Sequence, residues 1–198
     1  MKMWFYRFAV ALLKLFFLLM PVRQTGKESM PEEGPVILCG NHLSMLDPLA
    51  AAITFKRPLR FMGKKELFEK QPLKWIVTSL GAFPVDRGKG DLSAIRGAIG
   101  ILKDNQVLGI FPQGTRDVEG THEMLPGVAL IALRTGAPVI PMGFAQKCRL
   151  FHKTRLAIGE AVDLREFHGK MDSGTLKQAT EKISEAIYRQ CAIASGLK

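Results

Sequence analysis

A histidine and a carboxylate lie five residues apart in the segment Asn41–Pro48, which reads NHLSMLDP. A positioned imidazole such as that of His42 can remove the proton from a hydroxyl, which is typically worth about 10²–10⁴-fold in rate. A carboxylate such as Asp47 can hold one ring nitrogen of the histidine and thereby fix its tautomer. Asp47 directly before Pro48 is also a good helix N-cap, so its carboxylate could instead serve backbone amides alone. The pair predicts proton removal from a substrate hydroxyl, with a purely structural pair as the alternative.

A second group of polar residues occupies the segment Phe111–Arg116, which reads FPQGTR and follows the apolar run VLGI. The guanidinium of Arg116 can bind a phosphate through two hydrogen bonds. The backbone amides of Gly114 and Thr115 can face either a phosphate or an oxyanion that develops in a transition state. The segment therefore predicts an anion-binding loop, although the same residue types are also typical of a plain tight turn.

Two more cations are candidates for contact with the same anion. Arg87 lies in the segment Gly81–Gly88 (GAFPVDRG), and Lys64 follows the apolar run that begins at Leu59. Positive side chains that converge on one site attract an anionic substrate. Each of these cations taken alone is better explained as an ordinary surface charge.

The elements that must position these residues alternate between short apolar runs and helical patterns, which predicts an α/β domain with a central, largely parallel or mixed sheet flanked by helices. The predicted strands are Val36–Gly40, Leu59–Gly63, Ala82–Val85, Val107–Phe111, Pro138–Phe144 and Arg155–Gly159. The predicted helices are Pro48–Phe55, Pro72–Leu80, Leu92–Lys103, Val128–Arg134 and Thr175–Ala194. Sites in such sheets collect at the carboxyl ends of strands, so we expect the polar segments to meet at one edge.

The most apolar part of the chain is the segment Met3–Val22. Lys14 interrupts it, so neither uncharged part approaches the roughly 20 residues needed to span a bilayer. At 100° per residue, Arg7 and Lys14 fall about 20° apart and form one polar stripe on an otherwise apolar helix. This pattern favours a helix that lies in the membrane interface and ends near Pro21. The alternatives are a core helix with two surface charges and a shallow span in which Lys14 snorkels.

We therefore divide the chain into a basic amphipathic anchoring helix over residues 1–27 and one catalytic domain over residues 28–198. A polar linker predicted at Arg23–Gly34 spans the boundary between them. The net charge of +10 is uneven, because residues 1–27 hold five basic residues and no acid. We expect membrane association at the cytoplasmic face, with anionic lipid as the partner. The chain has no zinc-ligand spacing and no RNA-recognition motif, which argues against a nucleic-acid partner.

The three cysteines lack metal-ligand and redox spacing, and no residue pattern indicates a metal site. Cys39 lies near His42, but its apolar run favours a buried strand thiol over a nucleophile. The chain also has no G-x-S-x-G elbow, and Ser44 has no evident base at a suitable spacing. These observations favour direct attack by the substrate hydroxyl over a covalent enzyme intermediate.

The order and separation of the polar segments resemble the motif series of the lysophosphatidic acid acyltransferase family, the 1-acyl-glycerol-3-phosphate acyltransferases. His42 and Asp47 fall on the family's His-x₄-Asp motif. Arg87 falls on its second block, Phe111–Arg116 on its third and Val139–Pro141 on its fourth. The resemblance covers about Val36 to Phe144.

This resemblance implies a glycerolipid acyltransferase fold in which His42 is the general base and Asp47 orients it. It also implies that Arg87 and Arg116 hold the phosphate of a lysophospholipid acceptor. The donor would be acyl-CoA or acyl-carrier protein, and neither a metal nor another cofactor would be needed. The predicted substrate-binding set comprises Asn41, Lys64, Arg87, Gln113, Gly114, Thr115 and Arg116.

Two departures from the family pattern concern the acceptor. Gln113 stands where the family usually has glutamate, and Met124-Leu125 stands where it often has an aromatic residue and lysine. An amide can accept a hydrogen bond but cannot balance the charge of an arginine. The alternatives are therefore an acyltransferase for another lysophospholipid or glycerol-3-phosphate, and a membrane phospholipid-binding protein without catalysis.

Overall fold

The computed structural model of the chain describes residues 3–85, 92–116 and 123–197. The strands are β1 (Val22–Thr25), β2 (Val36–Gly40), β3 (Leu59–Lys64), β4 (Phe83–Val85), β5 (Val107–Ile110), β6 (Val139–Phe144) and β7 (Thr154–Ile158). They form one seven-stranded sheet in the order β1-β7-β6-β2-β5-β3-β4. All five residues of β2 are buried, as expected for a central strand that is covered on both faces.

The sheet is mostly parallel, which confirms the predicted fold class. Strand β2 pairs in parallel with β5 and β6, so that Leu38 lies beside Gly109 on one side and Ile140 on the other. Strand β3 pairs in parallel with β5 and β4. Among the described strands, only the β6–β7 pair is antiparallel, and β7 in turn pairs in parallel with β1. The carboxyl ends of β2, β5 and β6 therefore meet at one edge of the sheet.

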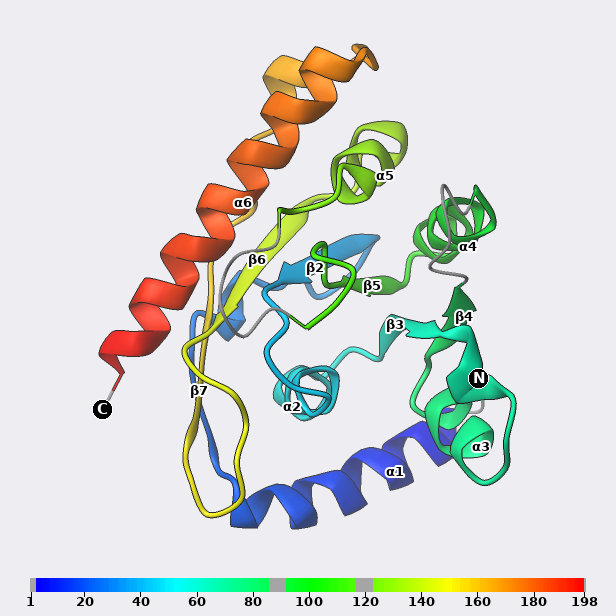
Figure 1. The fold of residues 1–198 in the computed structure, drawn as a ribbon, viewed down its shortest axis with the longest axis vertical. Coiled ribbons are helices and arrows are strands. Elements are labelled where there is room, and N and C mark those ends of the chain that lie inside the picture. The colour runs from blue at the N-terminus through cyan, green and yellow to red at the C-terminus, as the bar shows by residue number, and fades with distance from the viewer. Residues whose placement is uncertain (1–2, 86–91, 117–122, 198) are drawn as a thin grey trace.

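Helices cover both faces of this sheet. They are α1 (Met3–Phe16), α2 (Asp47–Thr54), α3 (Leu73–Ser79), α4 (Leu92–Lys103), α5 (Gly127–Thr135) and α6 (Ser173–Gly196). Figure 1 shows α4, α5 and α6 on one side of the strands and α1 and α2 on the other. Each side has its own apolar core, with Ile183 of α6 in the first and Ala50 of α2 in the second. Short 3₁₀ helices occur between these elements, at Phe17–Leu19, Lys27–Ser29, Lys65–Phe68 and Arg165–Phe167.

The predicted strands and helices are all present, with ends that shift by one or two residues. The polar linker predicted at Arg23–Gly34 is wrong. Strand β1 lies at its start and pairs with Thr154–Ala157 of β7, so the last residues of the predicted anchoring segment belong to the sheet. The sequence VRQT of β1 has alternate residues half-buried and exposed, and such a short edge strand has too little apolar periodicity to be recognised.

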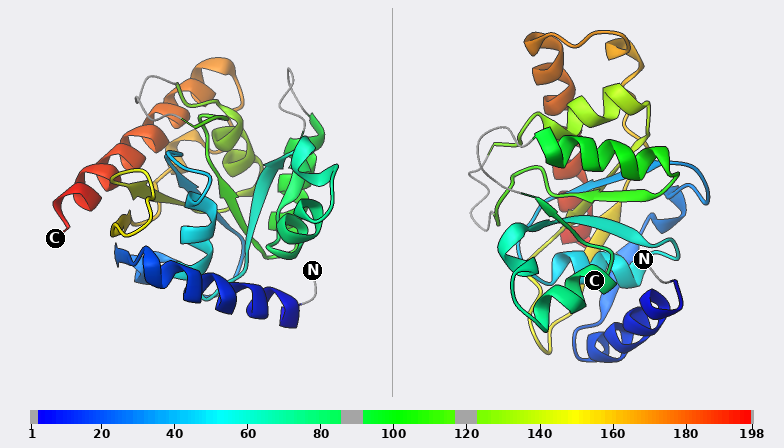
Figure 2. Two further views of the ribbon diagram at one scale, coloured as in Figure 1. Left: turned by 60° about the horizontal axis from the view of Figure 1, so that its bottom comes forward. Right: turned by 90° about the vertical axis from the view of Figure 1, so that its right-hand side faces the viewer.

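Helix α1 lies along one side of the molecule (Figure 2). Most of its large apolar side chains are exposed. Trp4 is 68% exposed and Leu15 is 65% exposed. Tyr6 is buried, and its hydroxyl accepts a hydrogen bond from the backbone N–H of Leu59 at 3.3 Å. The exposure of the apolar face argues against a core helix. None of the described helices is long and apolar enough to cross a bilayer.

The packing of α6 on β6 depends on a glycine. A Cβ atom built on Gly143 would lie 2.2 Å from the backbone nitrogen of Cys191 and 2.4 Å from the carbonyl carbon of Gln190. We expect Gly143→Ala to lower the free energy of unfolding by about 3 kcal/mol, because backbone atoms of α6 would have to move. Urea denaturation measures this loss. The control is Gly100→Ala in α4, where a Cβ meets open space and alanine should be neutral or stabilising.

Candidate active site

His42 lies in the loop that joins β2 to α2, and Asp47 is the first residue of α2. The imidazole Nδ1 lies 3.1 Å from Oδ2 of Asp47. Because an ionised carboxylate only accepts hydrogen bonds, this contact places the ring proton on Nδ1 and leaves Nε2 with its lone pair. The His42 side chain is 12% exposed and that of Asp47 is fully buried. The pair therefore has the geometry of a base with its orienting carboxylate.

The Asp47 carboxylate also organises the backbone of this loop. Its Oδ2 accepts hydrogen bonds from the N–H groups of Leu43 and Ser44, both at 2.6 Å. The first turn of α2 has no side-chain cap, since its N-cap residue is Leu46. The alternative that Asp47 serves as an N-cap is thus wrong. Asp47 bonds backbone amides that precede it, together with the ring of His42.

Aromatic rings stack against one face of the His42 imidazole. The ring of His42 stacks on Phe111 with 4.4 Å between centroids and an interplanar angle of 23°. Phe111 in turn stacks on Phe61 of β3 at 5.7 Å and 12°. Gly109 of β5 makes room for this stack, because a Cβ there would lie 2.1 Å from Cε1 of Phe61. The sequence placed Phe111 beside the site but did not predict the stack.

Two buried amides fix the strand ends around the pair. The side chain of Asn41 donates to the carbonyl oxygen of Phe144 at 3.0 Å and accepts from the N–H of Phe144 at 2.7 Å. The amide oxygen of Gln113 accepts from the backbone N–H of His42 at 3.1 Å. These bonds link the ends of β2, β5 and β6. Both residues thus have a structural contact, and their predicted contact with substrate stays a prediction.

Cys148 is a contact of the site that sequence reasoning missed. Its Sγ donates to Oδ1 of Asp47 at 3.5 Å, on the carboxylate oxygen that does not contact His42. Burial and the nearby charge of Asp47 raise the pKa of Cys148 to about 12, although a contact with Thr154 opposes this. The thiol therefore keeps its proton and can donate. A single cysteine that lies 101 residues from its partner has no recognisable spacing in the sequence.

Comparison with known proteins identifies the family of this chain. The family model described as Acyltransferase matches residues 21–145, a range that includes β2, the His42–Asp47 pair and Arg116. The chain belongs to the acyltransferase family.

Relatives of this acyltransferase come from several bacteria. The chain is 29% identical to the 1-acyl-sn-glycerol-3-phosphate acyltransferase of Bacillus subtilis over 192 residues. This alignment covers 92% of the chain and 94% of the relative. The protein of the same name from Streptococcus pneumoniae is 32% identical over 153 residues, or 76% of this chain and 55% of that protein. The crystal structure of the 1-acyl-sn-glycerophosphate acyltransferase PlsC from Thermotoga maritima has a TM-score of 0.71 and 23% identity, and covers 98% of this chain and 79% of that one. This structural similarity shows that the two proteins share a fold.

The predicted anion-binding loop of the acyltransferase directly follows the Phe111 stack. Thr115 and Arg116 are exposed, and Gly114 has a left-handed backbone with φ of +68°. The N–H of Gly114 donates to the carbonyl oxygen of Phe111 at 3.1 Å, so this amide closes a turn. An anion contact in this loop therefore rests on Thr115 and Arg116.

The other predicted cations lie farther from His42. Lys64 ends β3, which is separated from β2 by β5 and hence by about 10 Å across the sheet. Its ammonium pairs with Glu66 at 2.8 Å, and both side chains are exposed. Arg87 lies outside the described residues. The structure thus places Arg116 in the loop beside His42 and leaves Lys64 at a distance.

The candidate nucleophiles of the acyltransferase are occupied or buried. Cys39 is fully buried in β2, and burial raises the pKa of its thiol far above the usual range. The hydroxyl of Ser44 accepts a hydrogen bond from the N–H of Leu46 at 3.2 Å. Both observations support the prediction of direct attack. Within the described residues, no group of three or more His, Cys, Asp or Glu side chains is placed to hold a metal ion.

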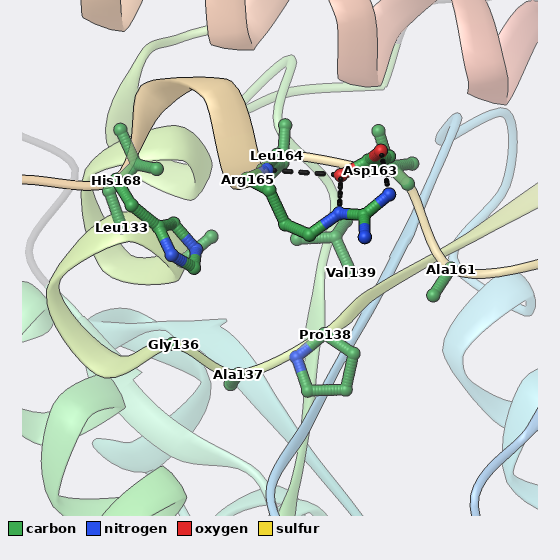
Figure 3. A pocket seen from close by; sticks show the side chains of 12 residues that line it. Leu133, Gly136, Ala137, Pro138, Val139, Ala161, Asp163, Leu164, Arg165 and His168 are labelled. Atoms are coloured by element: carbon green, nitrogen blue, oxygen red, sulfur yellow. Dashed lines mark hydrogen bonds and ion pairs between the residues drawn. The ribbon is translucent and has the colours of Figure 1, made fainter.

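A pocket of 340 Å³ lies elsewhere, between α5, the start of β6 and the segment around Arg165 (Figure 3). Pro138 and Val139 line it, and they lie at the amino end of β6. His42 follows the carboxyl end of β2, which runs parallel to β6. The pocket is therefore at the opposite edge of the sheet from the His42–Asp47 pair.

Proposed function

We propose that this acyltransferase transfers a fatty acyl group from a thioester donor to the free hydroxyl of 1-acyl-glycerol-3-phosphate, giving phosphatidic acid. The observation that carries the proposal is the His42–Asp47 pair, in which a buried carboxylate holds Nδ1 and directs Nε2 away from the protein contact. The names of the relatives from Bacillus subtilis and Streptococcus pneumoniae support the choice of acceptor.

The chemistry follows from one proton transfer. Nε2 of His42 takes the proton of the acceptor hydroxyl as its oxygen attacks the thioester carbonyl carbon. The negative charge of Asp47 stabilises the imidazolium that forms. The carbon–sulfur bond then breaks, and the departing thiolate takes the proton from Nε2. The products are an ester and a free thiol, and no covalent acyl-enzyme is formed.

The acceptor phosphate is assigned to Arg116, with the amide of Thr115 beside it. The guanidinium is exposed at the end of the loop that begins with the Phe111 stack. Apolar side chains flank the same edge: Met45, within the His42 loop, is 61% exposed, and Leu125 is 57% exposed. A cation beside exposed apolar groups suits a lysophospholipid, whose phosphate and acyl chain are joined through glycerol.

The donor is acyl-CoA or acyl-carrier protein, since both are acidic partners for a chain of net charge +10. We assign the membrane contact to α1. Its exposed apolar face and its cations Arg7 and Lys14 suit a helix in the interface at the cytoplasmic face of an anionic membrane. The enzyme would thus take its acceptor from the bilayer and return the product to it.

The test is transfer of labelled acyl groups from each donor to a panel of acceptors in detergent micelles. We expect lysophosphatidic acid to be the preferred acceptor. Arg116→Ala should raise the KM for it about 10- to 100-fold, because a charged hydrogen bond contributes about 1.5–3 kcal/mol. The rate with monoacylglycerol, which has no phosphate, should not change.

The matched control is Arg134→Ala, which removes an exposed arginine at the end of α5, on the other edge of the sheet. This variant should behave as wild type with every acceptor. An Arg116 variant that slows both acceptors equally would contradict the phosphate assignment. Preference for another lysophospholipid or for glycerol-3-phosphate would show that the proposed acceptor is wrong. A folded wild type that binds lipid but transfers no acyl group would contradict the proposed catalysis.

A further inference from the structure

The loop between β6 and β7 exposes two large apolar side chains within a basic sequence. The segment Lys147–Lys153, here called the basic loop, reads KCRLFHK, and residues 145–155 contain no acidic residue. Leu150 is 51% exposed and Phe151 is 78% exposed. The cations at both ends of the loop and at Arg149 are exposed as well. Apolar side chains ringed by cations are typical of contact with an anionic lipid surface.

The backbone of the basic loop holds Phe151 in an unfavourable conformation. Its φ is +63°, a left-handed value that is a genuine outlier for a bulky side chain. The N–H of Phe151 donates to the carbonyl oxygen of Leu19 at 2.8 Å, which fixes the loop in this shape. The result is a phenyl ring that points outward although burial would stabilise it. Strain of this kind persists where the side chain has a use.

The basic loop continues the exposed apolar face of α1. Its bond to Leu19 joins it to the 3₁₀ helix that follows α1, where Leu18 is 71% exposed and Leu19 is 47% exposed. Figure 1 and the right-hand view of Figure 2 both show the loop on the same side of the molecule as α1. One flat surface could therefore touch α1 and Phe151 together.

The charges decide which partner fits this surface. A second copy of the chain in a two-fold contact would place one basic loop against another, and like charges across an interface are unfavourable. An anionic membrane would neutralise Lys147, Arg149 and Lys153 and take up the apolar side chains between them.

We propose that the basic loop is a second membrane-contacting element, which inserts Leu150 and Phe151 into the interface of an anionic bilayer beside α1. The proposal extends the membrane contact proposed above for α1. The same loop contains Cys148, whose Sγ donates to Oδ1 of Asp47. The loop therefore brings the lipid surface next to the catalytic pair, where the acceptor hydroxyl must arrive.

Vesicle sedimentation tests the proposal with the full chain. The probes are phosphatidylcholine vesicles with and without phosphatidylglycerol. Phe151→Asn should weaken binding to the anionic vesicles about tenfold, the change expected when an aromatic side chain no longer inserts. Asparagine tolerates the left-handed conformation, so the thermal midpoint should stay the same or rise. Loss of binding with retained stability separates lipid contact from a structural role of the ring.

Two further variants complete the experiment. Ile193→Asn removes an exposed apolar side chain from α6 and should bind as wild type. Leu12→Asn alters the exposed face of α1 and should weaken binding. If Leu12→Asn weakens binding and Phe151→Asn does not, the proposal for the loop is overturned while that for α1 stands. A wild type that binds neither kind of vesicle overturns both, whatever its activity in micelles.

Discussion

His42→Ala is expected to reduce the turnover number about 10²–10⁴-fold, the usual contribution of a positioned general base. The hydroxyl of the acceptor has a pKa far above 7, so it must lose its proton as it attacks. Asp47 holds Nδ1 of His42. Among the described contacts of His42 none involves Nε2, so this nitrogen is available to the substrate hydroxyl. The measurement is the initial rate of labelled phosphatidic acid formation with saturating donor and acceptor.

The KM for lysophosphatidic acid should change little in this variant, since the phosphate is assigned to Arg116. The matched control is His168→Ala, which removes an exposed histidine from the pocket at the opposite edge of the sheet. Near-UV circular dichroism should show that both variants are folded. Turnover of His42→Ala close to the wild-type value would contradict its role as the base.

The fold was predictable because its strongest signals are local. Strands β2 and β5 are short, fully buried apolar runs, and β6 is a longer one. Each alternates with a helix whose apolar residues recur at helical spacing, and this order favours a parallel sheet. The His42–Asp47 pair could be predicted for the same reason, since the two residues lie only five positions apart.

The contacts that complete the site were not predictable, because they join residues far apart in the chain. The bond between Asn41 and Phe144 spans 103 positions, and that between Cys148 and Asp47 spans 101. A single polar residue has no periodicity that would reveal its partner. The stack of Phe61 on Phe111 is hidden likewise, since aromatic residues in strands are ordinary core residues.

The structure also shows what Gln113 does at the position where the lysophosphatidic acid acyltransferase family usually has glutamate. Gln113 is 6% exposed, and its amide oxygen accepts a hydrogen bond from the N–H of His42. This bond needs an acceptor but no charge. A neutral amide avoids the cost of burying a second carboxylate next to Asp47. Gln113 therefore supplies the acceptor that holds the His42 loop without adding a negative charge near His42.

Asp47→Asn and Asp47→Ala are expected to differ in stability but not in their loss of activity. Both remove the negative charge that stabilises the imidazolium, so turnover should fall about 100-fold or more in each. Asparagine keeps one oxygen that can accept from Leu43 and Ser44, whereas alanine leaves both buried amides without their acceptor. Each unsatisfied group costs about 1–3 kcal/mol, so only the alanine variant should lose about 2–6 kcal/mol of unfolding free energy.

The comparison decides whether the carboxylate acts on the base or only on the loop. Urea denaturation and initial rates are measured for both variants and for Asp104→Asn, which changes an acid after α4 and should match wild type in both. A purely structural Asp47 would make the loss of turnover follow the loss of stability, so that the asparagine variant stayed active. An inactive but stable asparagine variant instead requires the charge itself, because its shape and its bonds to Leu43 and Ser44 are retained.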